Sequence, residues 1–416
     1  MEVTELPQKA LNDYRPILGD EKIKEIRERA AALGKIRLAH VNSTSYGGGV
    51  AEILQNLVPL MRDVGIDTHW LVIEGPPEFY NITKKMHNAL QGNMALHLSD
   101  EERQLYLQVN EENARRLELD YDVVVIHDPQ PAAMIQFREN NDSAWLWRCH
   151  IDLSTPNMSF WGFISPFVHE YDYYVFHRPD YAQEDLSNER VVIMPPSIDP
   201  LAPKNENLPA EAVEEVLIRF GVDPRRPLLL QVGRFDPWKG LFDVIDVYHK
   251  VKENLPEVQL ALVGVMAGDD PEGWIFYERT LRKLGEDRDA FVVTNLIGAQ
   301  AHEVNAFQCA ATLVFQMSTR EGFGLTVSEA MWKNKVVIGR AVGGIKLQIV
   351  DGESGYLVNS VEEAAERSDF LLRQSEFAAT IGENAKERVQ QNFLITRHLE
   401  RYLDLLEHVQ AHAPMR

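Results

Sequence analysis

The chain of 416 residues is longer than the roughly 250–300 residues at which one hydrophobic core usually stops growing, so two domains are expected. Its composition, 45% hydrophobic and 25% charged, is that of an ordinary globular protein, and no apolar run approaches the ~20 residues of a membrane helix. The formal net charge of −21 disfavours binding to nucleic acid or to an anionic membrane. A phosphate ligand would therefore need a local group of basic residues.

The sequence also bears on the compartment and on metal content. Its acidic start, Met1–Leu6, lacks the basic and apolar segments of a secretion signal. Two cysteines, Cys149 and Cys309, are too few for a disulfide framework. The 13 histidines show neither an H-E-x-x-H motif nor paired-cysteine spacing. We therefore expect a cytoplasmic protein and predict no metal site.

Alternating strand and helix patterns in the first half of the chain predict a parallel α/β domain. A charged helix is expected within residues 1–35; then comes a predicted strand, Ile36–Val41, with the glycines Gly47–Gly49 and a helix over Val50–Val64 after it. The glycines do not form the G-x-G-x-x-G fingerprint, which disfavours a dinucleotide site. They form either a close-packed turn or a loop whose N–H groups contact a substrate. Residues 76–118 are predicted to be mostly helical.

Two buried strands are predicted to end in polar residues. The strand Tyr121–Ile126 is followed by His127–Pro131, and the strand Trp145–Cys149 is followed by His150. Open parallel sheets bind ligands at the carboxyl ends of their strands, so we expect a site there, with His150 as a candidate. A thiol nucleophile at Cys149 is disfavoured, because adjacent strand residues point to opposite faces.

A polar, proline-containing segment near residues 200–210 predicts a domain boundary. The α/β pattern then restarts with a strand over Leu228–Val232 and a helix over Leu241–Asn254. Between them, Arg234 and Lys239 lie five residues apart in a loop that begins and ends with glycine. A guanidinium and an ammonium group at the carboxyl end of a strand can clamp a diphosphate, so this loop is a predicted phosphate site.

The stretch Arg320–Trp332 is a second predicted phosphate site. Gly322 and Gly324 lead into a helix, and Thr326 is spaced from Glu329 as in a capping box, which predicts Thr326 as the N-cap. N–H groups at a helix N-terminus bind phosphate, and glycines let a ligand approach the backbone. The alternative is a turn, a capped helix and one solvated acid.

The end of the chain is predicted to be mainly helical. Gly352–Leu357 has the pattern of a short hairpin. Helices are expected from Val361 onward, and Arg397–Val409 is strongly amphipathic.

Together these motifs resemble those of the GT-B glycosyltransferases, specifically the retaining family that includes sucrose, trehalose and glycogen synthases. One signature is Glu321 and Glu329 with seven residues between them, and the other is Gly233-Arg234 with Lys239-Gly240. The resemblance extends over nearly the whole chain. Shorter stretches are similar to the trehalose glycosyltransferring synthases within that family, namely His40–Gly49, Val72–Pro77, His127–Pro131, Arg234–Gly240 and Gly264–Trp274.

The resemblance implies an α/β protein of the GT-B class, with two Rossmann-like domains that face a deep interdomain cleft. It implies an acceptor domain at residues 1–203, joined by a C-terminal helix over about residues 388–416 that crosses back to it. The donor domain would comprise residues 204–387.

The resemblance also implies roles for the motif residues. Arg234 and Lys239 would bind the donor diphosphate, Glu321 would contact the donor sugar, and Glu329 would bind the ribose. His150 would lie beside the sugar and contact the acceptor as well. The other implied contacts are Asp128 to the acceptor and, to the donor, Gly48, Gly49, Gly322, Phe323, Gly324 and Leu325.

The implied activity is the transfer of glucose from a nucleoside-diphosphate-glucose to free glucose with retention of configuration, forming α,α-trehalose. Arg234, Lys239 and the helix N-terminus would stabilise the departing diphosphate. No tightly bound cofactor is expected, and a divalent ion such as Mg²⁺ is compatible with the scheme without being implied by it. The partners would be nucleotide-glucose, glucose and trehalose, with neither nucleic acid nor membrane; a homodimer is compatible with the sequence.

Several alternatives stay open from the sequence. The acceptor could be a sugar phosphate or free phosphate, as in a trehalose phosphorylase, and the chain could bind a nucleotide sugar without catalysis. A glycoside hydrolase that uses Glu321 and Glu329 is disfavoured, because eight residues of helix would separate them by about 12 Å, whereas such enzymes need about 5–9.5 Å. The nucleobase cannot be read from the motifs.

Overall fold

The computed structural model describes residues 1–46, 48–138, 142–266 and 271–412. Gly47 of the predicted glycine loop and residues 267–270 of the Gly264–Trp274 stretch lie outside the described residues. The chain forms two compact units. The N-terminal unit comprises Met1–Ser197 and Ile395–Arg416, and the C-terminal unit comprises Ile198–Leu394. The chain thus passes between the units at Ser197 and at Leu394, whereas the resemblance implied boundaries near residues 203 and 388.

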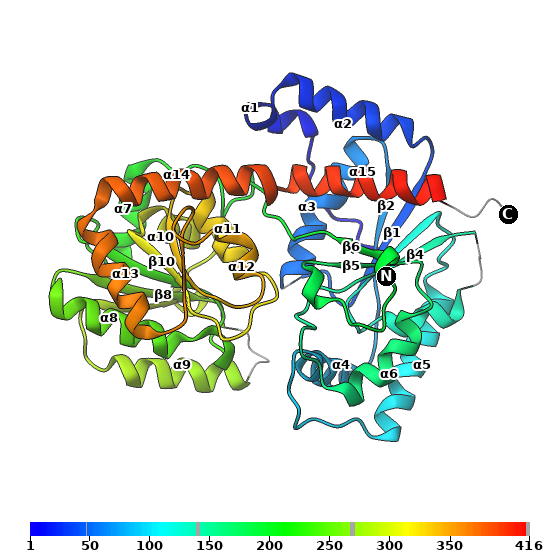
Figure 1. Ribbon diagram of the computed structural model, residues 1–416, viewed down its shortest axis with the longest axis horizontal. Coiled ribbons are helices and arrows are strands. Elements are labelled where there is room, and N and C mark those ends of the chain that lie inside the picture. The colour runs from blue at the N-terminus through cyan, green and yellow to red at the C-terminus, as the bar shows by residue number, and fades with distance from the viewer. Residues whose placement is uncertain (47, 139–141, 267–270, 413–416) are drawn as a thin grey trace. The chain divides into compact units, whose positions relative to one another are not determined.

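The N-terminal unit is built on a parallel sheet of six strands in the order β2-β1-β3-β4-β5-β6 (Figure 1). Its strands are β1 (Arg37–Asn42), β2 (Asp67–Val72), β3 (Val123–His127), β4 (Ala144–Arg148), β5 (Tyr173–Phe176) and β6 (Val191–Ile193). The chain adds β2 on one side of β1 and then returns to add β3 on the other side. The strand order therefore reverses between β1 and β3, which is where open α/β sheets bind ligands.

Helices cover both faces of this sheet (Figure 1). They are α1 (Arg15–Leu18), α2 (Asp20–Ala32), α3 (Gly49–Asp63), α4 (Pro77–Leu90), α5 (Asp100–Arg116), α6 (Met158–Val168) and α15 (Ile395–His412), with short 3₁₀ turns at Leu11–Tyr14, Ala132–Phe137, Pro179–Tyr181 and Asn188–Arg190. Alternate residues of β3 serve the two faces: Val123 and Val125 pack with α2, α3 and α15, while Val124 and Ile126 pack with α4, α5 and α6. Burial on both faces explains why β3 is a continuous apolar run.

The C-terminal unit contains a second parallel sheet of six strands, in the order β12-β11-β10-β7-β8-β9. Its strands are β7 (Leu228–Val232), β8 (Gln259–Gly264), β9 (Ala290–Thr294), β10 (Leu313–Gln316), β11 (Val336–Arg340) and β12 (Tyr356–Val358). Here the strand order reverses between β7 and β10. The predicted hairpin at Gly352–Leu357 is wrong, because β12 pairs with β11 in the parallel sense.

The helices of this unit are α7 (Ala210–Arg219), α8 (Leu241–Asn254), α9 (Pro271–Leu284), α10 (Ala301–Ala310), α11 (Leu325–Trp332), α12 (Ile345–Gln348), α13 (Val361–Arg373) and α14 (Ser375–Asn392), with 3₁₀ turns at Pro237–Lys239 and Asn295–Ile297. Apolar residues of α8 and α13 form one core with the sheet. The helix α11 packs against α14 and follows directly from the loop after β10. Among the described residues, no helix combines the length and the apolar character that a bilayer crossing requires.

Two helical glycines provide a matched test of packing. A Cβ added to Gly382 in α14 would lie 2.2 Å from the carbonyl oxygen of Asn334, whereas one added to Gly162 in α6 would meet nothing within 4 Å. Gly382→Ala should lower the free energy of unfolding, because overpacking against a backbone atom costs about 1–3 kcal/mol. Gly162→Ala should raise that free energy by up to about 1 kcal/mol, because alanine favours the helix. Urea denaturation followed by circular dichroism measures both, and equal effects would contradict the packing of α14.

Candidate active site

The loops that leave β7 and β10 lie next to each other in the C-terminal unit. The two strands are directly paired, with Leu313 opposite Leu229, and both point their carboxyl ends the same way. Their following loops therefore begin at the same edge of the sheet, at the point where the strand order reverses. This pairing brings Lys239 and Glu321 together although 82 residues separate them in the sequence.

Lys239 and Glu321 form an ion pair at the centre of this edge. The Lys239 Nζ donates to Glu321 Oε2 at 2.6 Å, and the two side chains are only 16% and 13% exposed. The same oxygen accepts hydrogen bonds from Gln316 Nε2 at 3.1 Å and from Ser318 Oγ at 3.0 Å. One charged and two neutral donors thus fix the Glu321 carboxylate in place.

The two loops are locked together through the backbone as well. The amide of Gln231 donates to the Lys239 carbonyl at 2.8 Å and accepts from the Met317 N–H at 3.0 Å. Gly240 has a φ of 63°, and a Cβ there would lie 2.0 Å from the Met317 carbonyl oxygen. Only glycine permits this approach, so Gln231 and Gly240 hold Lys239 against the loop that carries Glu321.

Arg234 has a different environment from Lys239. Its side chain is 71% exposed and its guanidinium lies 3.3 Å from Asp236 Oδ2. Burial raises the pKa of Asp236, while the positive charges of Lys239 and Arg234 oppose that rise. The two predicted cations thus act on one carboxylate, with Lys239 turned inward to Glu321 and Arg234 largely in solvent.

Gly322–Leu325 forms the predicted loop that enters a helix, but the cap differs from the prediction. The N-cap of α11 is Gly324, in the left-handed conformation with φ 82°, and Leu325 is the first helical residue. The predicted capping box at Thr326 is wrong, because the Thr326 hydroxyl donates to Gln316 Oε1 at 3.0 Å instead. The Gln348 amide donates to the carbonyls of Phe323 and Gly324, and the Val327 N–H donates to the Gly324 carbonyl at 3.0 Å.

Glu329 lies on α11 and is 1% exposed. Its Oε1 is 2.6 Å from Lys204 Nζ, and its Oε2 accepts from Gln308 Nε2 at 3.3 Å. Burial would raise the pKa of Glu329, but the charges of Lys204 and Lys333 outweigh burial and lower it. Burial also lowers the pKa of Lys333 to about 8. A ribose could reach this carboxylate only beside or in place of Lys204, which no local pattern in the sequence connects with Glu329.

In the N-terminal unit, predicted residues lie at the carboxyl ends of adjacent strands. Gly48 is the N-cap of α3 with φ 87°, and Gly49 is the first residue of that helix, which is the next helix after β1. Asp128 follows β3 with φ 64°, and its Oδ1 accepts from the His150 N–H at 2.7 Å. Burial raises the pKa of Asp128 to about 7. The structure therefore joins Asp128 to the backbone of His150, as neighbouring strand ends predict.

Four histidines form a row of hydrogen-bonded rings along this edge, which we call the imidazole row. His40 Nδ1 lies 3.0 Å from His127 Nε2, His127 Nδ1 lies 2.9 Å from His150 Nε2, and His150 Nδ1 lies 3.3 Å from His177 Nε2. Burial, assisted by the charge of Arg148, lowers the pKa of His40 to about 3. Burial also holds the pKa values of His127 and His150 well below their usual range. His40, His127 and His150 are therefore neutral at physiological pH.

Two other candidate sites carry less support. Burial raises the pKa of the Cys149 thiol, which opposes a thiolate nucleophile. No group of three His, Cys, Asp or Glu side chains within the described residues is arranged to hold a metal ion.

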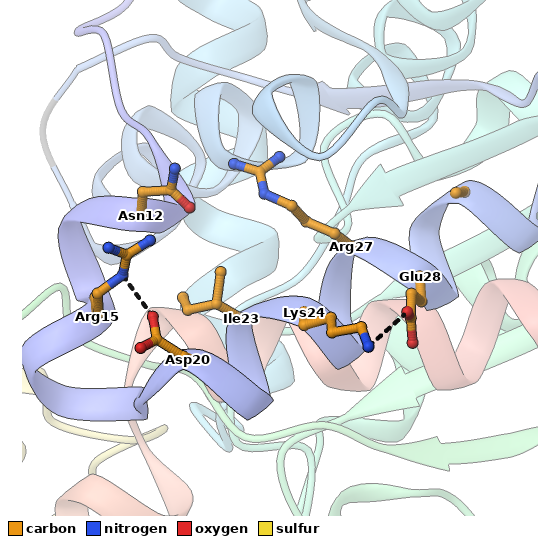
Figure 2. A pocket seen from close by; sticks show the side chains of 8 residues that line it. Asn12, Arg15, Asp20, Ile23, Lys24, Arg27 and Glu28 are labelled. Atoms are coloured by element: carbon orange, nitrogen blue, oxygen red, sulfur yellow. Dashed lines mark ion pairs between the residues drawn. The ribbon is translucent and has the colours of Figure 1, made fainter.

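A cavity of about 410 Å³ lies near the N-terminus of the chain, and Figure 2 shows the side chains that line it. None of the predicted site residues is among them. Its charged side chains pair with each other: Arg15 Nε lies 2.9 Å from Asp20 Oδ1, and Lys24 Nζ lies 3.6 Å from Glu28 Oε1. Because these cations are already compensated, we do not place the active site there.

The imidazole row should make the fold sensitive to acid. The unfolded chain protonates a histidine such as His40 near pH 6.5, whereas the folded chain resists protonation until about pH 3. Stability is therefore full above pH 6.5 and is lost as the pH falls from 6.5 toward 3, at about 1.4 kcal/mol per pH unit for each such histidine. His40→Asn should flatten this loss in urea unfolding between about pH 7 and pH 5. His302→Gln, at an exposed histidine, is the control; an unchanged slope in His40→Asn would contradict the assignment.

Comparison with known proteins assigns the sequence of this chain to a family. A family model described as "Trehalose synthase, N-terminal domain" matches residues 40–183, and one described as "Glycosyl transferases group 1" matches residues 214–388. The chain is 62% identical over 399 residues to the trehalose synthases of Thermococcus litoralis and Pyrococcus furiosus, covering 96% of this chain and 97% of each relative.

Solved structures show the same fold. The sucrose-phosphate synthase of Thermosynechococcus elongatus superposes with a TM-score of 0.71 at 17% identity, covering 91% of this chain and 100% of that one. At this identity the likeness concerns the fold alone. It confirms the predicted α/β class with two parallel sheets of the GT-B type. The chain therefore belongs to the trehalose synthase family of GT-B glycosyltransferases.

Proposed function

We propose that this hexosyltransferase moves glucose from a nucleoside-diphosphate-glucose to free glucose with retention of configuration, forming α,α-trehalose. The observation that carries the proposal is the Lys239–Glu321 ion pair beside the N-terminus of α11. It combines a cation for phosphate, a carboxylate for sugar hydroxyl groups and helix N–H groups at one edge of a sheet. The partners in this scheme are small molecules, and no tightly bound cofactor or nucleic acid takes part.

The chemistry rests on stabilisation of the leaving group. As the bond between the anomeric carbon and the diphosphate oxygen breaks, negative charge develops on the diphosphate. Lys239, Arg234 and the N–H groups at the start of α11 receive that charge, and one such donor commonly contributes about 3–4 kcal/mol. The ammonium group of Lys239 carries three N–H donors, so it can contact Glu321 and a phosphate oxygen together.

The acceptor hydroxyl then attacks from the face that the leaving group vacates. Its oxygen bonds to the anomeric carbon, and its proton passes to an oxygen of the departing diphosphate. Charge and atoms balance without a carboxylate nucleophile, and the configuration is kept. In this scheme Glu321 contacts the donor sugar, and His150, Asp128, Gly48 and Gly49 contribute contacts to the sugar and the acceptor.

The environment of the two glutamates opposes the hydrolase alternative. A hydrolytic pair needs one protonated carboxylic acid, with a raised pKa. Glu321 instead pairs with Lys239, and Glu329 pairs with Lys204 and has a lowered pKa. Glu329 is therefore expected to stay ionised, and Glu321 is held by an ammonium group.

The activity is tested by incubating the protein with several nucleotide-glucoses and with glucose, glucose 6-phosphate or no acceptor, and identifying the products by NMR. We expect α,α-trehalose and free nucleoside diphosphate with glucose as the acceptor. A product formed only from the phosphorylated acceptor, or glucose released alone, would overturn the acceptor assignment. Trehalose consumption with free phosphate and no nucleotide would indicate a phosphorylase.

Lys239→Ala should lower kcat by about 100-fold or more, which corresponds to about 2.7 kcal/mol of lost transition-state stabilisation. The matched control is Lys250→Ala on α8, whose ammonium lies 3.4 Å from Glu362 and is 45% exposed. Steady-state kinetics measure both variants, with circular dichroism as the check of folding. Near-normal turnover in a folded Lys239→Ala protein would remove the diphosphate clamp from the mechanism.

A second pair of variants separates ribose binding from structural pairing at Glu329. Glu329→Gln keeps the shape and removes the charge, and it should weaken nucleoside diphosphate binding by about tenfold, since a charged acceptor bonds hydroxyl groups more strongly. Lys204→Met should leave this affinity within about threefold. Calorimetric titration measures both. Equal losses in the two variants would show that the ion pair, and not a ribose contact, determines the affinity.

A further inference from the structure

The imidazole row crosses four neighbouring strands of the N-terminal sheet. His40 lies on β1, His127 ends β3, His150 follows β4 and His177 follows β5, which is the order of these strands in the sheet. Each strand thus contributes one ring that bonds to the ring of the next strand. Buried imidazoles cost free energy unless they are hydrogen-bonded, and apolar side chains would fill the same space without that cost. Packing alone therefore does not account for four hydrogen-bonded imidazoles at this edge of the sheet.

The hydrogen bonds of the row all run in one direction, and the unpaired Nε2 of His40 determines which direction it is. Each link joins one N–H to one bare nitrogen, and a neutral imidazole has one of each, so all the rings must donate the same way along the row. His40 Nε2 is buried and has no hydrogen-bond partner in the part of the chain that the structure describes. A buried N–H without a partner is rarer than a buried acceptor without one. His40 therefore keeps Nε2 bare and donates from Nδ1 to His127.

Arg148 helps to keep three rings of the row neutral. Its guanidinium is buried, donates to the Tyr402 hydroxyl at 2.9 Å, and lies close enough to oppose protonation of His40. The same charge opposes protonation of His127 and His150, so each of these rings keeps one N–H and one bare nitrogen, as a single direction along the row requires. The other titratable groups that face the row are Asp128 after β3, and His398 and Tyr402 on α15.

The direction fixes the tautomer of His150. Its Nε2 accepts from His127 Nδ1–H, and its own Nδ1–H points to His177. At 3.3 Å this last link is the longest of the three, the others being 3.0 and 2.9 Å. The bond from the Nδ1–H of His150 to His177 is thus the weakest of the three. A sugar hydroxyl oxygen can replace His177 as the acceptor more easily here than at the other links.

We propose that His127 is a positioning residue of the glucosyl transfer: its Nδ1–H fixes the tautomer and the ring plane of His150, so that His150 presents an N–H to a sugar hydroxyl. The proposal rests on the proposed function for the place of His150 beside the sugar. The tautomer itself follows from the row and does not depend on the reaction.

The first experiment measures the tautomers without any substrate. Full-length protein with isotope-labelled histidine is studied by long-range proton–nitrogen correlation spectra, and the signals are assigned with single-histidine variants. We expect the proton of His150 on Nδ1, and the same for His40 and His127. A proton on Nε2 of His150 would overturn the proposal. This result stands whether or not the enzyme makes trehalose.

The second experiment asks whether the link matters for turnover. His127→Asn retains an N–H near the Nδ1 position, whereas His127→Leu removes it. His127→Leu should lower kcat by about tenfold or more with little change in KM for the nucleotide-glucose, and His127→Asn should retain kcat within about threefold. Equal losses in both variants, or no loss in a folded His127→Leu protein, would overturn the positioning role.

These experiments also distinguish failure of the positioning role of His127 from failure of the proposed function. If the unsubstituted protein forms no trehalose, the proposed function is contradicted. The tautomer measurement then still tests the direction of the hydrogen bonds along the imidazole row. If His127→Leu does not fold, the wild-type spectrum and the His127→Asn kinetics decide. Retained kcat in His127→Asn with the His150 proton still on Nδ1 supports the proposal, and a loss of kcat with that tautomer unchanged overturns it.

Discussion

The candidate donor site depends on one ion pair, between Lys239 and Glu321. The chain carries a net charge of −21, so an anionic substrate is attracted only where a cation is held in place. Desolvating such a pair costs free energy that good geometry and further hydrogen bonds must offset. Gln316 and Ser318 provide those bonds, and Gln231 joins the two loops through their backbones. The position of the pair follows from the direct pairing of β7 with β10.

Local patterns were sufficient to predict the α/β alternation and the loop that carries Arg234 and Lys239. The helix Leu241–Asn254 has the predicted bounds, and the loop after β7 carries the predicted cations because strand, glycine and helix signals are adjacent in sequence. The capping box fails at Thr326 but exists at Ser99, whose hydroxyl accepts from the Glu102 N–H at 3.2 Å. At Thr326 the left-handed Gly324 caps the helix first. Spacing alone does not tell which residue begins a helix.

The contacts that sequence reasoning missed join residues far apart in the chain. Lys204 and Glu329 are 125 residues apart, and only the fold of the loop after Ser197 brings them together. The imidazole row likewise takes one histidine from each of four strands, so strand order had to be known before the rings could be connected. The candidate sites of the two units also differ in electrostatics: Glu321 and Glu329 each pair with a lysine, whereas His40, His127 and His150 are kept neutral by burial and by the charge of Arg148.

The close approach of Gly240 to the Met317 carbonyl has a consequence for engineering the donor preference of this enzyme. A Cβ at this position would lie 2.0 Å from the Met317 carbonyl oxygen, so any other residue at Gly240 would force the two loops apart. Trp238 in the same loop has an exposed side chain and is assigned no contact to the diphosphate, so variation there alters the contact area while the backbone of the loop is kept. Substitutions that preserve the backbone of this loop are thus confined to positions whose side chains are exposed.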